Sequence, residues 1–227
     1  MDPHELPFPF PVVEWRDGAL RLIDQCLLPE ELTFRDCSDI PSLCVAIREL
    51  AVRGAPAIGV AAAWGMALSW DLARRDGCDT AAAAERLAVD REALAATRPT
   101  AVNLFWALDR QARLVGEMVA AGADVVTVGR MLAAEAAIIR EEDVALGKAM
   151  GEAGAALLPD EAVGLTHCNA RGLATGGYGT APGGIYAAPH AGQKGPASAP
   201  ATRPLPQGAR PTAWALPAPG PPATAVS

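Results

Sequence analysis

The chain has 227 residues, of which 51% are hydrophobic and 20% charged, and its formal net charge is −7. Residues 181–227 hold three basic residues and no acidic one, so the first 180 residues carry −10; this acidic body excludes nucleic acid as a main partner, because phosphate binding needs clustered Lys and Arg. The five cysteines and three histidines show no disulfide framework and no metal-ligand spacing, so we expect reduced thiols, no metal and a cytoplasmic protein.

The opening segment, residues 12–40, is predicted to be rich in β-strand. Two runs of strand-forming residues, 12–15 and 20–24, flank the pair Asp17-Gly18. Asp-Gly between two such runs is a strong turn signal. We therefore expect a β-hairpin near the start of the chain.

The first helix is expected to begin with Ser42 as its N-cap and to stop near Arg53-Gly54. Its buried face is predicted from the helical spacing of Leu43, Ala46, Ile47 and Leu50.

Pro56 suits the first turn of the next helix, which is expected to reach Arg75 and to end at Asp76-Gly77. Residues 55–70 form the longest apolar run. At 16 residues, the run is shorter than the roughly 20 that a membrane span needs. It therefore predicts a buried helix and no membrane partner.

Three further helices are expected before residue 159. Breaks and caps place them from Asp79 or Thr80 to about Thr97, from Thr100 to Ala121-Gly122, and from about Asp124 to Leu158. Residues 163–167 then form an apolar strand. A Gly-rich turn and a helix up to residue 188 are expected to follow, as in the first unit of a parallel α/β domain.

The predicted fold class is α/β. We expect a mostly helical N-terminal domain with the β-hairpin over residues 1–158, the start of a parallel α/β domain over 159–190, and a disordered tail over 191–227. Of the 20 prolines, 11 fall in residues 181–227, and proline removes the donors of helices and sheets alike. One half-domain cannot close a parallel sheet, so we expect the sequence to be cut short.

Two arginines stand directly before predicted helix starts. Arg53 precedes the helix that opens near Pro56, and Arg98 precedes Pro99-Thr100. A guanidinium beside the unpaired amides of a helix N-terminus favours a phosphate or a sugar hydroxyl. The alternatives are a solvated Arg53 in an ordinary helix–helix turn, and an Arg98 whose charge interacts favourably with the C-terminal end of the preceding helix dipole.

The predicted strand ends next to Cys168, and a run of small residues, 172–180, follows. Amides exposed at the carboxyl end of a strand favour a ligand. Cys168 is a candidate thiolate nucleophile, a polar stabiliser or a buried small hydrophobe, and His167 points to the opposite strand face. Residues 177–182 fall short of G-x-G-x-x-G, which disfavours a dinucleotide cofactor.

Three long segments in the right order resemble one known family. Residues 52–68, 98–110 and 166–180 are similar to S-methyl-5-thioribose-1-phosphate isomerases of the methionine salvage pathway, and the match spans residues 12–216. The superfamily also contains ribose-1,5-bisphosphate isomerases and regulatory subunits of the translation initiation factor that exchanges guanine nucleotide. The resemblance implies a small, mostly helical N-terminal domain and a Rossmann-like domain, with the sugar phosphate between them.

The resemblance also implies an activity: the aldose-to-ketose isomerisation of methylthioribose 1-phosphate, without a cofactor, by a homodimer. Cys168 is implied to stabilise the transition state, and substrate contacts are implied for Arg53, Gly54, Ala55, Arg98 and Gln207. The family's proton donor is an aspartate beyond the glutamine segment. No Asp or Glu follows Glu161 here, so we expect this chain to be inactive. A non-catalytic regulatory subunit related to the initiation-factor complex is the alternative.

Overall fold

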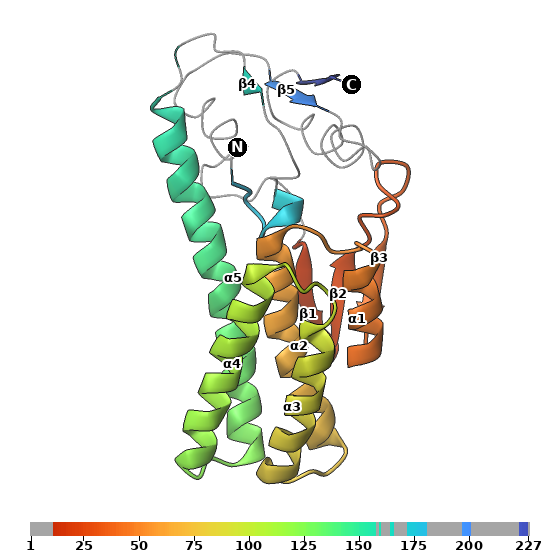
Figure 1. The fold of residues 1–227 in the computed structure, drawn as a ribbon, viewed down its shortest axis with the longest axis vertical. Coiled ribbons are helices and arrows are strands. Elements are labelled where there is room, and N and C mark those ends of the chain that lie inside the picture. The colour runs from red at the N-terminus through yellow and green to blue at the C-terminus, as the bar shows by residue number, and fades with distance from the viewer. Residues whose placement is uncertain are drawn as a thin grey trace. The chain divides into compact units, whose positions relative to one another are not determined.

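The computed structural model describes residues 11–157, 159, 164–165, 172–180, 197–200 and 223–226. The chain divides into two compact units, and Figure 1 labels most of their elements. The helical unit consists of Val13–Cys26 and Thr33–Glu141, and the C-terminal unit consists of Met1–Val12, Leu27–Leu32 and Glu142–Ser227. The domain boundaries at residues 158 and 190 remain a prediction.

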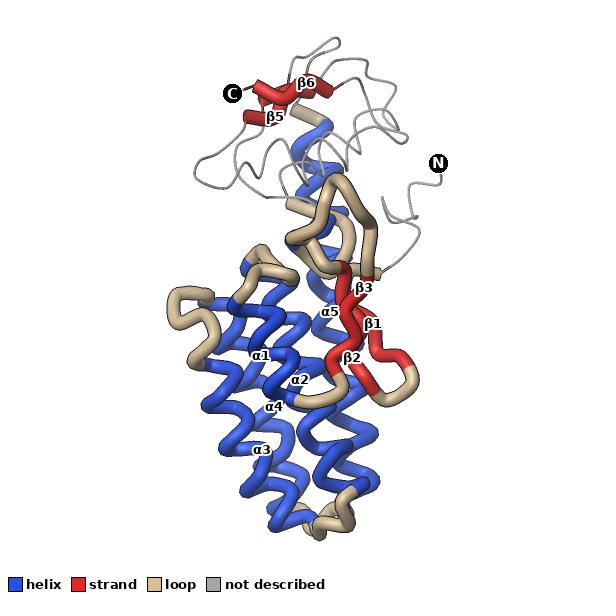
Figure 2. The backbone as a smooth tube through the Cα atoms, turned by 90° about the vertical axis from the view of Figure 1, so that its right-hand side faces the viewer, coloured by secondary structure: helices blue, strands red, loops and turns tan. Residues whose placement is uncertain are grey.

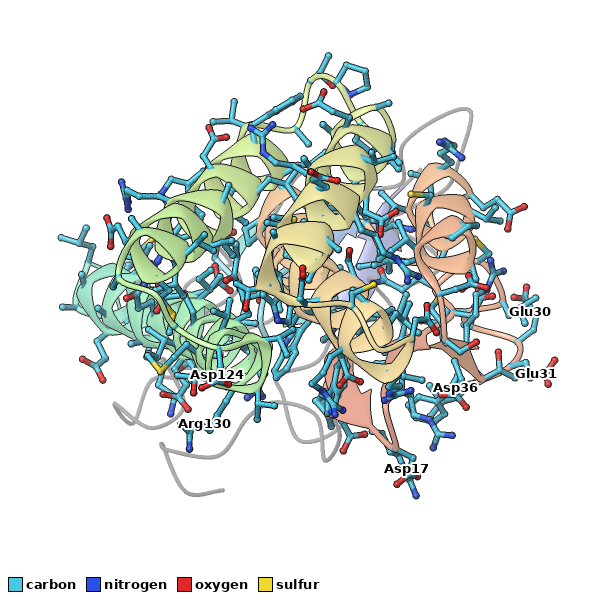
Figure 3. All side chains as sticks on the ribbon, turned by 90° about the horizontal axis from the view of Figure 1, so that it is seen from below. Asp17, Glu30, Glu31, Asp36, Asp124 and Arg130 are labelled. Carbon is cyan, nitrogen blue, oxygen red and sulfur yellow. The ribbon has the colours of Figure 1, made fainter. Side chains whose placement is uncertain are left out.

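The helical unit begins with a three-stranded antiparallel sheet in the order β1-β2-β3. Its strands are β1 (Val13–Arg16), β2 (Ala19–Ile23) and β3 (Phe34–Cys37). Asp17 and Gly18 both have positive φ, 51° and 77°, as a two-residue hairpin turn requires. The predicted hairpin is therefore confirmed, with Asp17 in its turn (Figure 3).

Helix α1 (Ile40–Arg48) is capped by Asp39, whose carboxylate accepts a hydrogen bond from the Ser42 amide at 2.8 Å. The prediction of Ser42 as the cap is wrong, because a proline in the first turn already suits the helix before that residue. The predicted end near Gly54 is also wrong. Leu50 has a φ of 67°, which breaks the helix and excludes Leu50 from its buried face.

Helix α2 (Ala55–Arg75) is the buried central helix of this unit, as the apolar run predicts. It packs against the sheet, against α1 and against the next two helices along the chain (Figure 2). Near its start, a Cβ added to Gly59 would lie 2.9 Å from the Asn103 carbonyl oxygen, so the backbones approach closely here. Near its end, the Trp70 indole donates to the Val125 carbonyl oxygen at 2.8 Å. In the part of the chain that is described, no helix is long and apolar enough to cross a membrane.

Three more helices follow: α3 (Thr80–Ala95), α4 (Val102–Ala120) and α5 (Val125–Ala155). Asp79 caps α3 by accepting from the Ala82 amide at 2.8 Å, and Asp124 accepts from the first amides of α5 (Figure 3). The predicted cap of α4 at Thr100 is wrong. The cap position is Ala101, which has no side-chain oxygen and leaves the helix start uncapped.

Gln111 on α4 is fully buried among α2, α4 and α5. Its side-chain amide donates to the Ala63 carbonyl oxygen on α2 at 3.2 Å and to the Leu132 carbonyl oxygen on α5 at 3.0 Å. A single polar side chain therefore bonds to both neighbouring helices inside an apolar core.

The C-terminal unit contains a parallel sheet in the order β4-β5-β6, with strands β4 (Gly164–Leu165), β5 (Ala197–Pro200) and β6 (Ala223–Val226). β4 lies within the strand predicted over 163–167. β5 and β6 fall in the tail predicted to be disordered, and the prediction is wrong for these two strands. Their residues are small, and the one proline among them, Pro200, is the last residue of β5. The rest of the tail lies outside the described residues.

Candidate functional site

The starts of α2 and α4 lie side by side at one end of the helical unit (Figure 1). Gly59 meets Asn103 near both starts, and the Gln111–Ala63 hydrogen bond lies further along both helices, so the two helices run parallel. Arg53 and Arg98 each precede one of these starts. The structure therefore brings together the two arginine-led helix starts that the sequence singled out.

Arg53 is half-buried in the loop between α1 and α2. Its Nε donates to the Leu50 carbonyl oxygen at 3.1 Å, and its Nη2 donates to the Gln25 carbonyl oxygen at 3.2 Å. Nη1 makes no hydrogen bond within the described residues. The guanidinium thus ties two loops together and keeps donors for a ligand, so it is not the fully solvated Arg53 of the alternative interpretation.

Gly54 is the N-cap of α2, with φ 97° and ψ 132°. This φ lies in the region that favours glycine. No side chain caps the first turn, while the Gly54 carbonyl oxygen already accepts from the Ile58 amide at 2.9 Å. Ala55 is exposed. The amides at this helix start are therefore free to face an anion.

Arg98 is half-buried in the loop between α3 and α4. Its carbonyl oxygen accepts from the Ala101 amide at 3.0 Å, and the buried Thr97 hydroxyl donates to the Leu94 carbonyl oxygen at 2.6 Å. These bonds hold the backbone of the turn. The Arg98 guanidinium itself makes no hydrogen bond or ion pair within the described residues, and it remains available to an anion.

A polar network that the sequence analysis missed lies beneath the loop before α2. Asp24, only 6% exposed, accepts from the Arg35 Nε at 3.2 Å, the Arg35 Nη2 at 2.8 Å and the Cys26 amide at 3.0 Å. Arg35 also donates through Nη1 to a Glu49 carboxylate oxygen at 2.8 Å. The one signal in the sequence is that Asp24 directly follows the apolar residues of β2.

The described cysteines are free: Cys26, Cys37, Cys44 and Cys78. Burial, followed by the negative charge of Asp24, raises the pKa of the Cys26 thiol, which donates to the Glu49 carbonyl oxygen at 3.0 Å. Burial raises the pKa of Cys37 to about 11. The Cys26 and Cys37 thiols are therefore protonated at neutral pH and unsuited to nucleophilic attack. Among the described residues, no cluster of three potential metal ligands occurs.

Three glycine amides in the Gly-rich segment of the C-terminal unit have side-chain acceptors. The Thr175 hydroxyl oxygen accepts from the amides of Gly177 and Gly179, at 3.2 and 2.9 Å, and Asp143 on α5 accepts from the Gly176 amide at 2.5 Å. The prediction of exposed amides is wrong for these three glycines, because a hydroxyl and a carboxylate provide their acceptors.

The same segment packs tightly on α5. A Cβ added to Gly147 would lie 2.6 Å from the Gly179 carbonyl oxygen, and the neighbouring Tyr178 is 6% exposed. Burial raises the pKa of Asp143, and its hydrogen bond from the Gly176 amide opposes that rise. Cys168 and Gln207, the other two predicted site residues, lie outside the described residues.

Comparison with known proteins identifies the family. The Initiation factor 2 subunit family (IF-2B) matches residues 51–227. The chain belongs to this family. The chain is 49% identical over 220 residues to the methylthioribose-1-phosphate isomerase of Geobacter metallireducens. The alignment covers 96% of this chain and 62% of that protein. The enzyme of the same name from Geobacter sulfurreducens is 48% identical, with the same coverage.

Two crystal structures resemble this chain. The 5-methylthioribose 1-phosphate isomerase of Pyrococcus horikoshii matches with a TM-score of 0.89 and 35% identity, over 100% of this chain and 63% of that chain. The translation initiation factor eIF-2B subunit delta of A. fulgidus matches with a TM-score of 0.84 and 41% identity, over 96% and 62%. The chain thus spans 62% of the length of the Geobacter relatives. The predicted resemblance to the isomerases is confirmed.

Proposed function

We propose that this chain binds methylthioribose 1-phosphate and serves its isomerisation to methylthioribulose 1-phosphate. The observation that carries the proposal is the juxtaposition of two helix starts, each preceded by an arginine, at one end of the helical unit. Helix N-termini and guanidinium groups both stabilise a phosphate. The names of the Geobacter and Pyrococcus relatives support the choice of this sugar phosphate.

In this proposal Arg53 and Arg98 bind the substrate through guanidinium donors that the described protein leaves free. Gly54 and Ala55 contribute the uncapped start of α2. The roles of Cys168, which stabilises the transition state, and of Gln207, which contacts the substrate, follow from the family resemblance alone.

The reaction has one chemical difficulty. A phosphate on the anomeric oxygen prevents spontaneous ring opening, so the ring oxygen must be protonated while a hydrogen moves from C2 to C1. A positioned acid contributes roughly 10²–10⁴ to the rate of such a step. The hydrogen moves within one molecule, so the reaction needs no external redox cofactor. We also propose a homodimer and a cytoplasmic location, as the family resemblance implies.

Isothermal titration of the 227-residue chain with methylthioribose 1-phosphate tests the binding proposal. We expect the wild type to bind, and Arg98→Ala to weaken binding about tenfold or more, because a charge-assisted hydrogen bond is lost. Arg130→Ala is the matched control, because Arg130 is an exposed arginine on α5 that serves no proposed contact (Figure 3). No binding by the wild type, or equal binding by Arg98→Ala, would overturn the proposal.

Turnover is followed on the same sample by the phosphorus NMR signal of the ketose phosphate. The family resemblance implies a proton donor in the segment after Glu161, and residues 162–227 hold no Asp or Glu, so we propose that this polypeptide binds without appreciable product. Product formation above background would show that this prediction is wrong.

A regulatory, non-catalytic role is the second candidate, and the likeness to the A. fulgidus subunit delta favours it. A pure interaction subunit has no need for two arginines with donors left for a ligand at paired helix starts. Recovery of translation-factor partners with the tagged chain, together with no binding of methylthioribose 1-phosphate, would favour the second candidate over the first.

A further inference from the structure

We propose that Arg35 is a positioning residue for the sugar-phosphate site. By holding the Asp24 carboxylate, Arg35 keeps that carboxylate away from Arg53 and leaves the Arg53 guanidinium able to bind the substrate. This inference rests on the proposed function of Arg53, and it assigns a role to two residues, Asp24 and Arg35, that contact no substrate themselves.

Both oxygens of the Asp24 carboxylate accept hydrogen bonds. Its Oδ1 accepts from the Cys26 amide at 3.0 Å, and its Oδ2 accepts both Nε and Nη2 of Arg35, at 3.2 and 2.8 Å. The side chain of Asp24 is 9% exposed. Arg35 therefore provides the counter-charge to an almost buried carboxylate.

Arg53 contacts the two residues that directly follow Asp24. Its Nη2 lies 3.2 Å from the Gln25 carbonyl oxygen and 3.9 Å from the Cys26 sulfur. The charges of Asp24 and Arg53 both act on the Cys26 thiol, the first raising its pKa and the second lowering it. A buried anion and the proposed substrate-binding cation therefore both contact Cys26, and no ion pair joins the two within the described residues.

The strengths of the bonds explain why Arg35 matters. Arg53 bonds to two neutral carbonyl oxygens, of Leu50 and Gln25, and such bonds are weaker than a guanidinium–carboxylate pair. A buried carboxylate without a counter-charge is strongly unfavourable. If Arg35 were absent, the Arg53 guanidinium would turn to Asp24, and its donors would no longer face an incoming phosphate.

Glu49 completes the arrangement without competing for Arg53. Its side chain is 56% exposed and accepts from the outer edge of Arg35 at 2.8 Å. Water can solvate this carboxylate when the pair is broken, so Glu49 gains much less than Asp24 from a new cation.

The test compares four variants in their affinity for methylthioribose 1-phosphate. Arg35→Met keeps the length of the side chain and removes its charge, and we expect about a tenfold loss of affinity. Arg35→Lys should retain most of the affinity, because it keeps the charge. Asp24→Asn and the double variant Asp24→Asn/Arg35→Met should both bind within about threefold of the wild type, because no carboxylate remains to attract Arg53.

Arg21→Met is the matched control in the same sheet. It breaks an ion pair between β2 and β3, with Asp36, that has contacts of 2.7 and 2.8 Å (Asp36 is labelled in Figure 3). Its affinity should equal that of the wild type. A purely structural role for Arg35 predicts instead that folded Arg35→Met binds as tightly as the wild type and loses only stability, seen as a lower urea midpoint.

If Arg35→Met does not fold, Arg35→Gln takes its place in the affinity comparison, with the same expected loss and the same rescue by Asp24→Asn. Full affinity in a folded Arg35→Met, or a folded double variant without rescue, would overturn the proposal. A crystal structure of ligand-free Arg35→Met gives a readout independent of substrate: Arg53 should bond to Asp24, and an Arg53 still on the Gln25 carbonyl oxygen would overturn the proposal. Failure of the wild type to bind methylthioribose 1-phosphate would instead overturn the proposed function.

Discussion

Gly59 illustrates how one missing methyl group determines the distance between two helices. A Cβ at this position would lie 2.9 Å from the Asn103 carbonyl oxygen and 3.2 Å from the Asn103 Cβ. The nearest atom belongs to backbone, which cannot rotate away as the end of a flexible side chain can. The spacing between the α2 and α4 starts, and hence between the loops that carry Arg53 and Arg98, therefore depends on this glycine.

Gly59→Ala should destabilise the protein by about 1–3 kcal/mol, because the added methyl overpacks the contact between α2 and α4. Gly116→Ala is the matched control on α4. No atom lies within 4 Å of a Cβ there, so it should stabilise the protein by about 0.4–1 kcal/mol through the unfolded chain. Urea unfolding measures both. Equal midpoints for the two variants would contradict the steric argument.

At the scale of elements, the sequence predicted the N-caps of some helices correctly and of others wrongly. Asp79 and Asp124 cap α3 and α5 as expected, because each carboxylate precedes its helix by the spacing that reaches a free amide. Ser42 and Thr100 also carry oxygen atoms, but the backbone takes the cap conformation at Asp39 and Ala101 instead. Side-chain chemistry alone does not decide where a chain turns into a helix.

Asp79→Ala should lower the free energy of unfolding by about 1 kcal/mol, because the Ala82 amide loses its acceptor. Thr100→Ala should change it by less than about 0.5 kcal/mol, because the exposed Thr100 side chain caps nothing. Thermal or urea unfolding of the pair distinguishes a cap from a residue that merely resembles one. A larger loss in Thr100→Ala than in Asp79→Ala would contradict the assignment.

Elements whose structure depends on neighbouring residues were predicted from the sequence. The Asp17-Gly18 turn and the proline-led apolar run of α2 are contained within a few turns of chain, and both were predicted. Strands β5 and β6 could not be predicted, because their small residues have no periodic pattern and their pairing joins distant segments. Arg53 and Arg98 could be proposed from motifs, but their common location depends on the packing of α2 on α4. The bond between Arg35 and Asp24 arises only when β2 and β3 pair.

Across the whole molecule, charge is unevenly distributed, and several carboxylates are stabilised in their ionised form. A hydrogen bond from Arg21 lowers the pKa of Asp36, and hydrogen bonds from Ser42 and Thr127 lower those of Asp39 and Asp124. Such groups stabilise the fold above their unfolded pKa, about 3.9, and this contribution is lost as the pH falls through the folded value. Asp143 acts in the opposite direction, because its pKa is raised.

The urea concentration at the unfolding midpoint should therefore decrease as the pH is lowered from about 5 to about 2. Among the described residues, the carboxylates with a lowered pKa (Asp36, Asp39 and Asp124) outnumber the one with a raised pKa, Asp143. Asp39→Asn should reduce this dependence, since an amide oxygen still accepts from the Ser42 amide but does not titrate. A midpoint that rises on acidification would show that burial of groups such as Asp143 dominates.

The shared bonds of Gln111 fix the alignment of three helices at once. A slide of α4 by one turn, about 5.4 Å, would carry this amide away from the carbonyl oxygens of Ala63 and Leu132 and strand it in an apolar interior. Shifted packings of similar hydrophobic quality are thereby penalised, so a sequence rich in interchangeable alanines can still select a single arrangement of its helices.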